Sequence, residues 1–275
     1  MTLESSQKNK LEKKRHTKLK IFLGTVVIVV ILTFVSLPFA LQERQANPAE
    51  VNPTSFNELG WRQIGTVDRS SYDLKYVATL RINVAALNYI DNQLAGQVNI
   101  EKNRIVDMYK AQHPELPGSI ATPDIALPQV SRLATLRTMP PMISDFFGDQ
   151  LVHMVTDQLI SQGESIMKQW GVRNVRKVGQ IQLTVRAKSV AASVYEGDLT
   201  AELGGKLVTI HLKGIFAAWY ENGIVMAAGV VPSGTLKYDY VMGSVTIPLS
   251  FDFEKTGAGG GSEFNELLKL VEGIS

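Results

Sequence analysis

The chain has 275 residues, of which 45% are hydrophobic and 20% charged, and it contains no cysteine. This composition is typical of a folded protein with one sizeable core, and it excludes a disulfide-stabilised scaffold or a disordered chain. The net charge of +2 comes from the N-terminus, because residues 1–20 hold seven Lys or Arg and two acidic residues. The rest of the chain is slightly acidic, so nothing indicates a nucleic-acid-binding domain.

An uncharged apolar segment, residues 21–41, follows this basic tail. As a helix it would rise about 30 Å, which matches the hydrocarbon thickness of a bilayer. A cleaved secretory signal is the rival interpretation, but its apolar stretch is usually only about 7–15 residues and ends at a small-x-small site. Here Pro38 stands at the upstream small position. We expect an uncleaved single-pass signal anchor in the cell membrane, with the basic tail of residues 1–20 cytoplasmic and the C-terminal domain extracytoplasmic.

Residues 42–60 are polar, contain two prolines and show no hydrophobic periodicity. This pattern predicts a spacer that lifts the following domain off the bilayer. We therefore expect one extracytoplasmic domain over residues 61–275.

The first part of this domain has apolar residues at intervals of three and four, between residues 71 and 110 and again between 142 and 170. Such spacing predicts amphipathic helices, the first either broken at Gly96 or replaced there by a second helix. Residues 71–170 are therefore expected to be helical, apart from a proline-rich arm over residues 113–141.

From residue 177 the hydrophobic period changes to two, which predicts β-strands through residue 254. Asn222-Gly223 joins two apolar runs and is typical of a tight hairpin turn. Ser262 is a suitable N-cap for a final helix over residues 262–273. The expected fold class is α+β: an N-terminal transmembrane helix, then helices packed on an antiparallel β-meander, with a C-terminal helix.

The proline-rich arm, residues 113–141, is the least ordinary part of the domain, because long irregular stretches inside compact domains are uncommon. One interpretation is a loop whose apolar residues cover the core. The other is an extended partner-binding arm that offers aliphatic anchors. The candidate anchors are Ile120, Ile125, Leu127 and Val130.

Three short motifs resemble those of penicillin-binding proteins and serine β-lactamases: Ser165-x-x-Lys168, Tyr220-x-Asn222 and Lys255-Thr256-Gly257. The resemblance implies a serine nucleophile activated by Lys168. The sequence departs from the pattern, since Ser165 lies near the end of its predicted helix and the interval to Lys255 is about half the usual one. Tyr220-x-Asn222 is also explained by the hairpin.

No other pattern of cofactor, metal or catalytic residues stands out. The histidines of the domain are isolated in sequence, and the glycine run after Lys255 is typical of a flexible tether. The leading expectation is a non-enzymatic, membrane-anchored protein-interaction or assembly component of the cell envelope, without catalytic residues, cofactor or metal, that binds one or more envelope proteins. The alternatives are a membrane-tethered serine hydrolase and a domain that binds a hydrophobic ligand between helices and sheet.

Overall fold

The computed structural model describes residues 44–75, 79–116, 127–139, 164–165 and 167–275, with side chains excepted over residues 72–82. The predicted anchor at residues 21–41 and most of the predicted helix at 142–170 lie outside these residues. Among the helices that are described, none combines the length and the hydropathy needed to cross a membrane.

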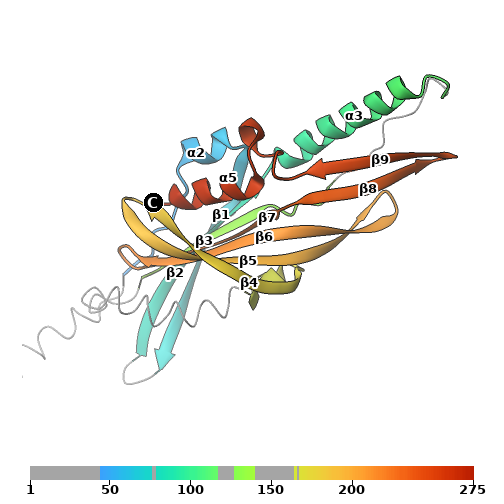
Figure 1. The fold of residues 1–275 in the computed structure, drawn as a ribbon. Helices are drawn as coiled ribbons and strands as arrows, with labels where there is room; N and C mark the ends of the chain where they lie inside the picture. Colours follow the sequence, from blue (N-terminus) through green and yellow to red (C-terminus); the bar gives the residue numbers. More distant parts are fainter. Residues whose placement is uncertain (1–43, 76–78, 117–126, 140–163, 166) are drawn as a thin grey trace, which may run out of the picture.

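A seven-stranded antiparallel sheet forms the body of the domain (Figure 1). Its strand order is β1-β2-β3-β7-β6-β5-β4, and each neighbouring pair is antiparallel. The strands are β1 (Trp61–Lys75), β2 (Thr79–Asp91), β3 (Arg132–Met139), β4 (Arg173–Val185), β5 (Lys188–Leu203), β6 (Lys206–Tyr220) and β7 (Ile224–Pro232).

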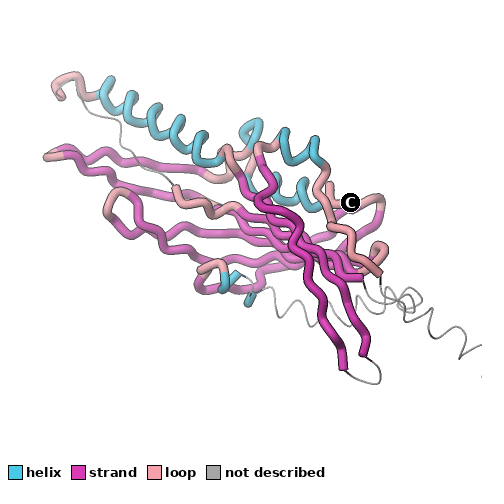
Figure 2. The backbone as a smooth tube through the Cα atoms, turned by 180° about the vertical axis from the view of Figure 1, so that it is seen from behind, coloured by secondary structure: helices cyan, strands magenta, loops and turns pink. Residues whose placement is uncertain are grey.

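The remaining elements are a separate hairpin and the helices. The hairpin consists of β8 (Thr235–Met242) and β9 (Val245–Asp252), and the helices are α2 (Pro53–Glu58), α3 (Leu94–Gln112), the 3-10 helix η2 (Ala258–Gly260) and α5 (Glu263–Glu272). In Figures 1 and 2, α2 and α5 cover one face of the sheet, α3 runs beside β8 and β9 at one end, and the β1–β2 hairpin projects at the other.

The main core lies between the sheet and α5. Strand residues at alternate positions point to this face, and α5 supplies its apolar stripe through Leu267, Leu270 and Val271. The centre of the sheet meets this helix closely, because a Cβ on Gly229 would lie 2.5 Å from Leu267 Cδ1. A second core joins β8, β9 and α3 to the opposite face of the sheet, including Phe216 and Val230.

The α+β class, the antiparallel sheet and the C-terminal helix are confirmed. The predicted β6–β7 hairpin lies at the centre of the sheet, and its turn uses positive φ angles at Asn222 (50°) and Gly223 (115°). Ser262 caps α5 as predicted, since its hydroxyl accepts from the backbone N–H of Asn265 at 3.2 Å.

The prediction of helix over residues 71–91 is wrong, because this region forms β1 and β2. In β2, Leu87 and Tyr89 are buried on the α5 face, whereas Val84 and Ile90 are buried with the opposite side-chain parity. A strand buried on both faces loses its period of two, so its apolar residues can match the three-and-four spacing of a helix. Gly96 does not break a helix either, because it lies in the first turn of α3.

The prediction of an irregular arm through residue 141 is also wrong in part. Residues 132–139 form β3, which lies between β2 and β7 near the centre of the sheet. The strand contributes Leu133 to the main core. Prolines on either side of this short strand concealed it, because proline usually marks the end of regular structure.

The predicted spacer at residues 42–60 is contradicted from residue 44 onward. Ala46, Ala49 and Val51 are buried, and residues 53–58 form α2. The Thr135 hydroxyl donates to the Ala49 carbonyl at 2.6 Å, and the Tyr89 hydroxyl accepts from the Val51 N–H at 3.1 Å. This segment is therefore part of the fold, and it leaves only two residues between the predicted anchor and the domain.

Candidate functional site

At the end of the domain opposite the β1–β2 hairpin, α3, the β8–β9 hairpin and the β5–β6 turn extend together (Figure 1). α3 packs on β9 through Leu94, Val98 and Val106, which are buried. The β5–β6 turn lies against β8, where Lys206 Nζ donates to the carbonyl of Asp239 at 3.1 Å. We name this region the α3 end and define it as α3 with residues 203–207 and 241–245.

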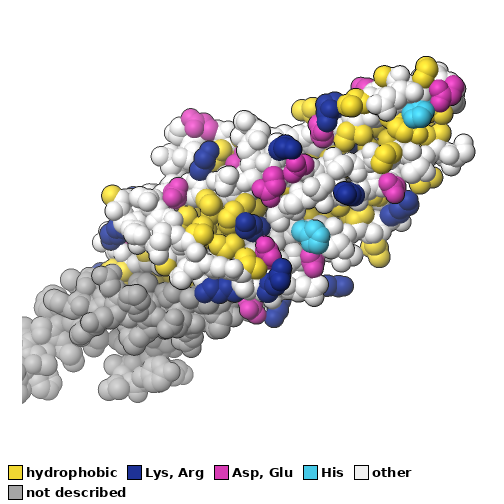
Figure 3. All heavy atoms as spheres, in the orientation of Figure 1, with side chains coloured by type: hydrophobic (Ala, Val, Ile, Leu, Met, Phe, Trp, Pro, Cys, Tyr) yellow, Lys and Arg dark blue, Asp and Glu magenta, His cyan; other side chains and the backbone are white. Residues whose placement is uncertain are grey.

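The α3 end carries most of the exposed large apolar side chains. Of the six in the described part of the chain, four lie here, namely Ile100 (70% exposed), Met108 (49%), Leu207 (76%) and Val241 (49%). Figure 3 shows hydrophobic side chains gathered beneath α3 at this end. A concentration of exposed large apolar side chains at one end of a domain can mark an interaction site.

Charged side chains lie among and beside these apolar residues. On α3, Arg104 Nε donates to Glu101 Oε2 at 2.9 Å, and this contact lowers the pKa of Glu101. Just past α3, His113 Nδ1 lies 3.1 Å from Glu115 Oε1.

A second feature is a cluster of three buried carboxyl groups, Asp91, Glu263 and Glu266, where β2 ends and α5 begins. Asp91 Oδ1 accepts from the backbone N–H groups of Gln93 at 2.7 Å and Leu94 at 3.3 Å. Asp91 thereby satisfies N–H groups at the start of α3 that have no partner within the helix.

The two glutamates of the cluster are bound to the loop before α5. Glu263 Oε1 accepts from the Thr256 hydroxyl at 2.8 Å, and Glu266 Oε1 accepts from the backbone N–H of Ala258. Burial, with a smaller contribution from the neighbouring carboxyl groups, raises the pKa of Glu263 to about 7 and that of Glu266 to about 8. Burial also raises the pKa of Asp91. Glu266 consequently holds a proton at neutral pH.

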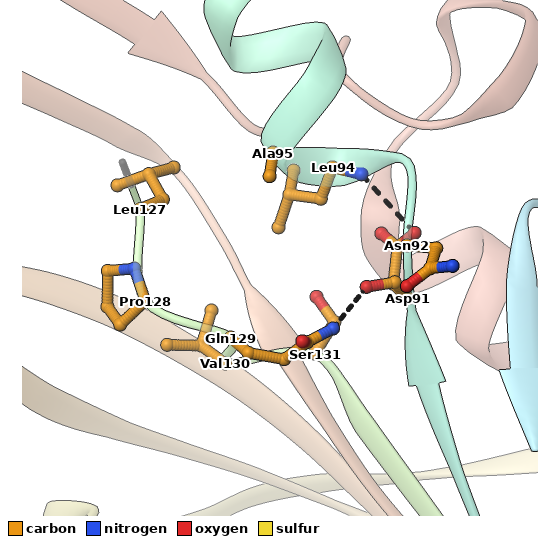
Figure 4. Close-up of a pocket in the computed structure, with 9 residues that line it drawn as sticks. All are labelled: Asp91, Asn92, Leu94, Ala95, Leu127, Pro128, Gln129, Val130 and Ser131. Carbon is orange, nitrogen blue, oxygen red and sulfur yellow. Dashed lines mark hydrogen bonds between the residues drawn. The ribbon is translucent and has the colours of Figure 1, made fainter. Parts of the chain in front are cut away.

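A cavity of about 170 Å³ lies beside Asp91, under the first turn of α3 (Figure 4). Leu94, Leu127 and Val130 form apolar walls, and Gln129 donates from its amide to the Asp91 carbonyl. Within the described residues, the buried Ser131 hydroxyl that lines the cavity has no hydrogen-bond partner. The cavity is large enough for a few water molecules or a small polar group.

A more open groove of about 550 Å³ crosses β4, β5 and β6 on the α5 side of the sheet. Asp198 accepts from Asn174 Nδ2 at 2.9 Å and lies 2.7 Å from His211 Nδ1, and these two contacts lower its pKa. Asp198 and His211 are directly paired across β5 and β6. The contact therefore has the geometry of a cross-strand pair on an exposed sheet face.

The structure separates the four predicted partner-binding residues. Leu127 and Val130 are buried in the second core and line the cavity beside Asp91. Ile120 and Ile125 lie outside the described residues. A partner-binding role for the arm stays a prediction, but two of its four proposed anchors contact the core.

The three motifs that resemble those of serine hydrolases lie on separate elements. Lys168 forms an ion pair with Glu164 at 3.7 Å, and Lys255 forms one with Asp252 at 2.9 Å in the turn after β9. Tyr220-x-Asn222 belongs to the β6–β7 turn. Among the described residues, no hydrogen bond joins Ser165 to either lysine.

Sequence reasoning missed both the carboxyl cluster and the α3 end. Asp91 fell within a wrongly predicted helix, and Glu263 and Glu266 are ordinary acidic residues for the first turn of a capped helix. No short-range sequence pattern indicated that Asp91 lies beside Glu263 and Glu266 in the fold. Met108 belongs to the apolar spacing that predicted a helix, and only the three-dimensional structure shows that Met108 and Ile100 are exposed.

Comparisons with known proteins give one family. Neither the curated proteins nor the solved structures contain a match. Residues 48–275, which include all of the sheet and every helix from α2 onward, match the family described as a domain of unknown function, DUF6517. The matched region begins seven residues after the predicted anchor ends at Leu41. The chain belongs to the DUF6517 family.

Proposed function

We propose that this protein is a membrane-anchored, extracytoplasmic and non-enzymatic component of the cell envelope, whose domain binds another envelope protein through the α3 end. The observation that carries the proposal is the concentration of exposed apolar side chains at one end of the domain. Ile100, Leu207 and Val241 belong to α3, β6 and β8, three elements that the fold brings to the same end of the domain.

The arrangement of the domain along the chain supports this proposal. A basic tail and a 21-residue apolar segment precede residue 44, where the folded domain already begins. The first described residues lie against the β1–β2 hairpin, since Asn83 Nδ2 donates to the Arg44 carbonyl at 2.8 Å. The α3 end lies at the opposite end of the domain (Figures 1 and 2), where a partner meets least obstruction from the bilayer.

Site-specific photo-crosslinking in intact cells tests the proposal. A photoreactive residue replaces Ile100 or Leu207 in the full-length chain, and Glu58, exposed on α2, is the control position. We expect the same membrane or envelope protein to be captured from positions 100 and 207 and not from position 58. Equal capture from all three positions, or none from 100 and 207, contradicts binding through the α3 end.

A pair of charge substitutions then tests whether the captured protein binds by apolar contact. Ile100→Asp and Leu207→Asp are expected to reduce its co-purification at least tenfold, since each places a charge in an apolar interface. Both side chains are exposed, so the thermal unfolding midpoint of the domain should change little. Undiminished co-purification with both variants would refute the proposed surface.

A further inference from the structure

The carboxyl groups of Asp91 and Glu263 meet inside the domain. Asp91 is the last residue of β2 and Glu263 the first of α5, and they are only 5% and 1% exposed. Their side chains lie within hydrogen-bonding range of one another. An ionised carboxyl group is only an acceptor, so two carboxyl groups can form a hydrogen bond only when one of them carries a proton. The contact between Asp91 and Glu263 therefore requires one proton.

The other hydrogen bonds of the pair indicate where this proton lies. Asp91 Oδ1 accepts from the backbone N–H groups of Gln93 and Leu94, and Glu263 Oε1 accepts from the Thr256 hydroxyl. Glu263 Oε2 is buried and has no hydrogen-bond partner within the described part of the chain. Buried polar atoms without a partner are rare in folded proteins. A proton on Glu263 Oε2 that is donated to Asp91 gives this oxygen a partner.

The charges around the pair disfavour two ionised carboxylates. Glu266, the next buried carboxyl group on α5, adds a third acid, and the nearby base Lys269 acts on Glu266. The first turn of α3 has no titratable side chain. Burial raises the pKa of both groups, that of Glu263 to about 7, so the pair holds its proton below that pH and loses it above. The bases that neighbour the cluster in sequence form pairs of their own, namely Lys255 with Asp252 and Arg62 with Asn92, each at 2.9 Å.

The pair joins the start of α3 to the start of α5. Through Asp91 it satisfies two N–H groups of the first turn of α3 that have no partner within the helix. A cavity of about 170 Å³ lies under this turn, lined by Asp91 and by Ser131, whose buried hydroxyl has no partner among the described residues (Figure 4). Protein interiors are usually closely packed, so unfilled volume at this place allows the turn to shift without displacing the core.

We propose that Asp91 and Glu263 share one proton, and that this proton bridge holds the first turn of α3 against α5 until a rise in pH removes it. Release of the proton to solvent leaves two buried carboxylates side by side, and their repulsion and desolvation favour separation. Asp91 then turns into the cavity, where the Ser131 hydroxyl can donate to it, and its bonds to Gln93 and Leu94 weaken.

The bridge also affects the surface at the α3 end. Because α3 carries Ile100 and Met108, the proton controls how firmly these exposed apolar side chains are held on the domain. Only this consequence rests on the proposed function, and the bridge itself does not.

Carbon-13 NMR of the full-length chain in detergent micelles tests the bridge without any substitution. The carboxyl carbons of Asp91 and Glu263 are followed from about pH 4 to about pH 10, a range that includes the ordinary and the raised pKa values of both groups. We expect the two carbons to shift together in a common step near pH 7, as for two groups that share one proton. Separate steps for the two carbons, or ionisation of both below about pH 5, would overturn the proposal.

Hydrogen exchange at the amides of Gln93 and Leu94 tests what the bridge holds. After correction for the intrinsic pH dependence of exchange, we expect their protection to fall at least tenfold between about pH 6 and about pH 9. Glu263→Gln and Asp91→Asn should each reduce this fall to less than about threefold, because a side-chain amide permanently supplies the donor that the proton provides. Glu266→Gln neutralises the neighbouring carboxyl group outside the bridge, so it is the matched control and should keep the fall.

Constant protection in the unmodified protein, or an equal fall in all four proteins, would overturn the proposal. Both measurements use the chain without a partner. Their failure therefore removes the bridge and leaves binding through the α3 end standing, whereas failure of the crosslinking experiment leaves the bridge intact.

Discussion

At the scale of single residues, the buried carboxyl cluster couples stability to pH. Glu263 and Glu266 have pKa values of about 7 and about 8 in the folded domain, against 4.5 for an ordinary glutamate. The folded domain thus binds these protons more tightly than the unfolded chain does. Their stabilising effect is complete below pH 4.5 and is lost as the pH rises through the two folded values.

We predict that the free energy of unfolding falls between about pH 5 and about pH 8.5, by up to about 1.4 kcal/mol per pH unit for each group. Urea unfolding across this range measures the slope. Glu266→Gln should flatten it and increase stability at the alkaline end, whereas Glu58→Gln, on the exposed end of α2, should leave it unchanged. The pKa values of Glu101, Asp198 and Asp252 are lowered in the folded domain. These three groups therefore make the free energy of unfolding rise with pH, and they do so at more acidic pH. A flat profile for the unmodified protein would refute the coupling.

Two glycine substitutions are predicted to have opposite effects. Gly223→Ala should destabilise the domain by about 1–3 kcal/mol or more, because Gly223 has a φ of 115° and a Cβ there would lie 2.3 Å from the Thr138 carbonyl. Gly96→Ala should stabilise it by about 0.5–1 kcal/mol, since position 96 lies in α3 with no atom within 4 Å of the added Cβ. Thermal unfolding of both variants checks the signs, and a neutral Gly223→Ala contradicts the turn geometry.

At the scale of elements, the segment before β1 is held by contacts distant in sequence. Its backbone pairs with the C-terminus, because the N–H of Asn52 donates to the Gly273 carbonyl at 3.0 Å and the N–H of Ser275 donates to the Glu50 carbonyl at 2.8 Å. The Thr135 hydroxyl in β3 donates to the Ala49 carbonyl. These bonds join both ends of the domain to the sheet.

We predict that Thr135→Val destabilises the domain by about 1–2 kcal/mol, because it leaves the buried Ala49 carbonyl without its donor. Thr209→Val, at an exposed position of β6, is the matched control and should be near neutral. Hydrogen exchange supplies a second measurement, in which the amides of Val51 and Asn52 are protected in the unmodified protein and exchange faster in Thr135→Val. Rapid exchange of both amides in the unmodified protein would restore the spacer interpretation.

Elements specified by local signals could be predicted from the sequence, and elements held by distant contacts could not. The β6–β7 hairpin and the cap of α5 were predictable because their signals, Asn222-Gly223 and Ser262, act on adjacent residues. β2 was not, since burial on both faces removes the alternation. The docked segment at residues 44–52 was not, because Tyr89 and Thr135 lie 38 and 86 positions from their partners. The carboxyl cluster likewise joins Asp91 to residues near the C-terminus.

At the scale of the whole molecule, the proposed arrangement places one end of the domain near the bilayer and the other end away from it. The β1–β2 hairpin holds the entering chain, and the α3 end carries the exposed apolar side chains. A seven-stranded sheet with a packed helix layer joins them (Figure 1). Such a body can hold a binding surface at a fixed position relative to the bilayer.

We propose that the domain lies outside a membrane to which residues 21–41 anchor it, and cysteine accessibility in intact cells tests this arrangement most directly. Leu207→Cys provides one thiol at the α3 end, and Ser5→Cys provides one in the basic tail of an otherwise cysteine-free chain. With a membrane-impermeant maleimide, we predict labelling at position 207 in intact cells, labelling at position 5 only after lysis, and retention of the protein in the membrane fraction after alkaline washing. Labelling at position 207 only after lysis, or release of the protein by the wash, would contradict the account.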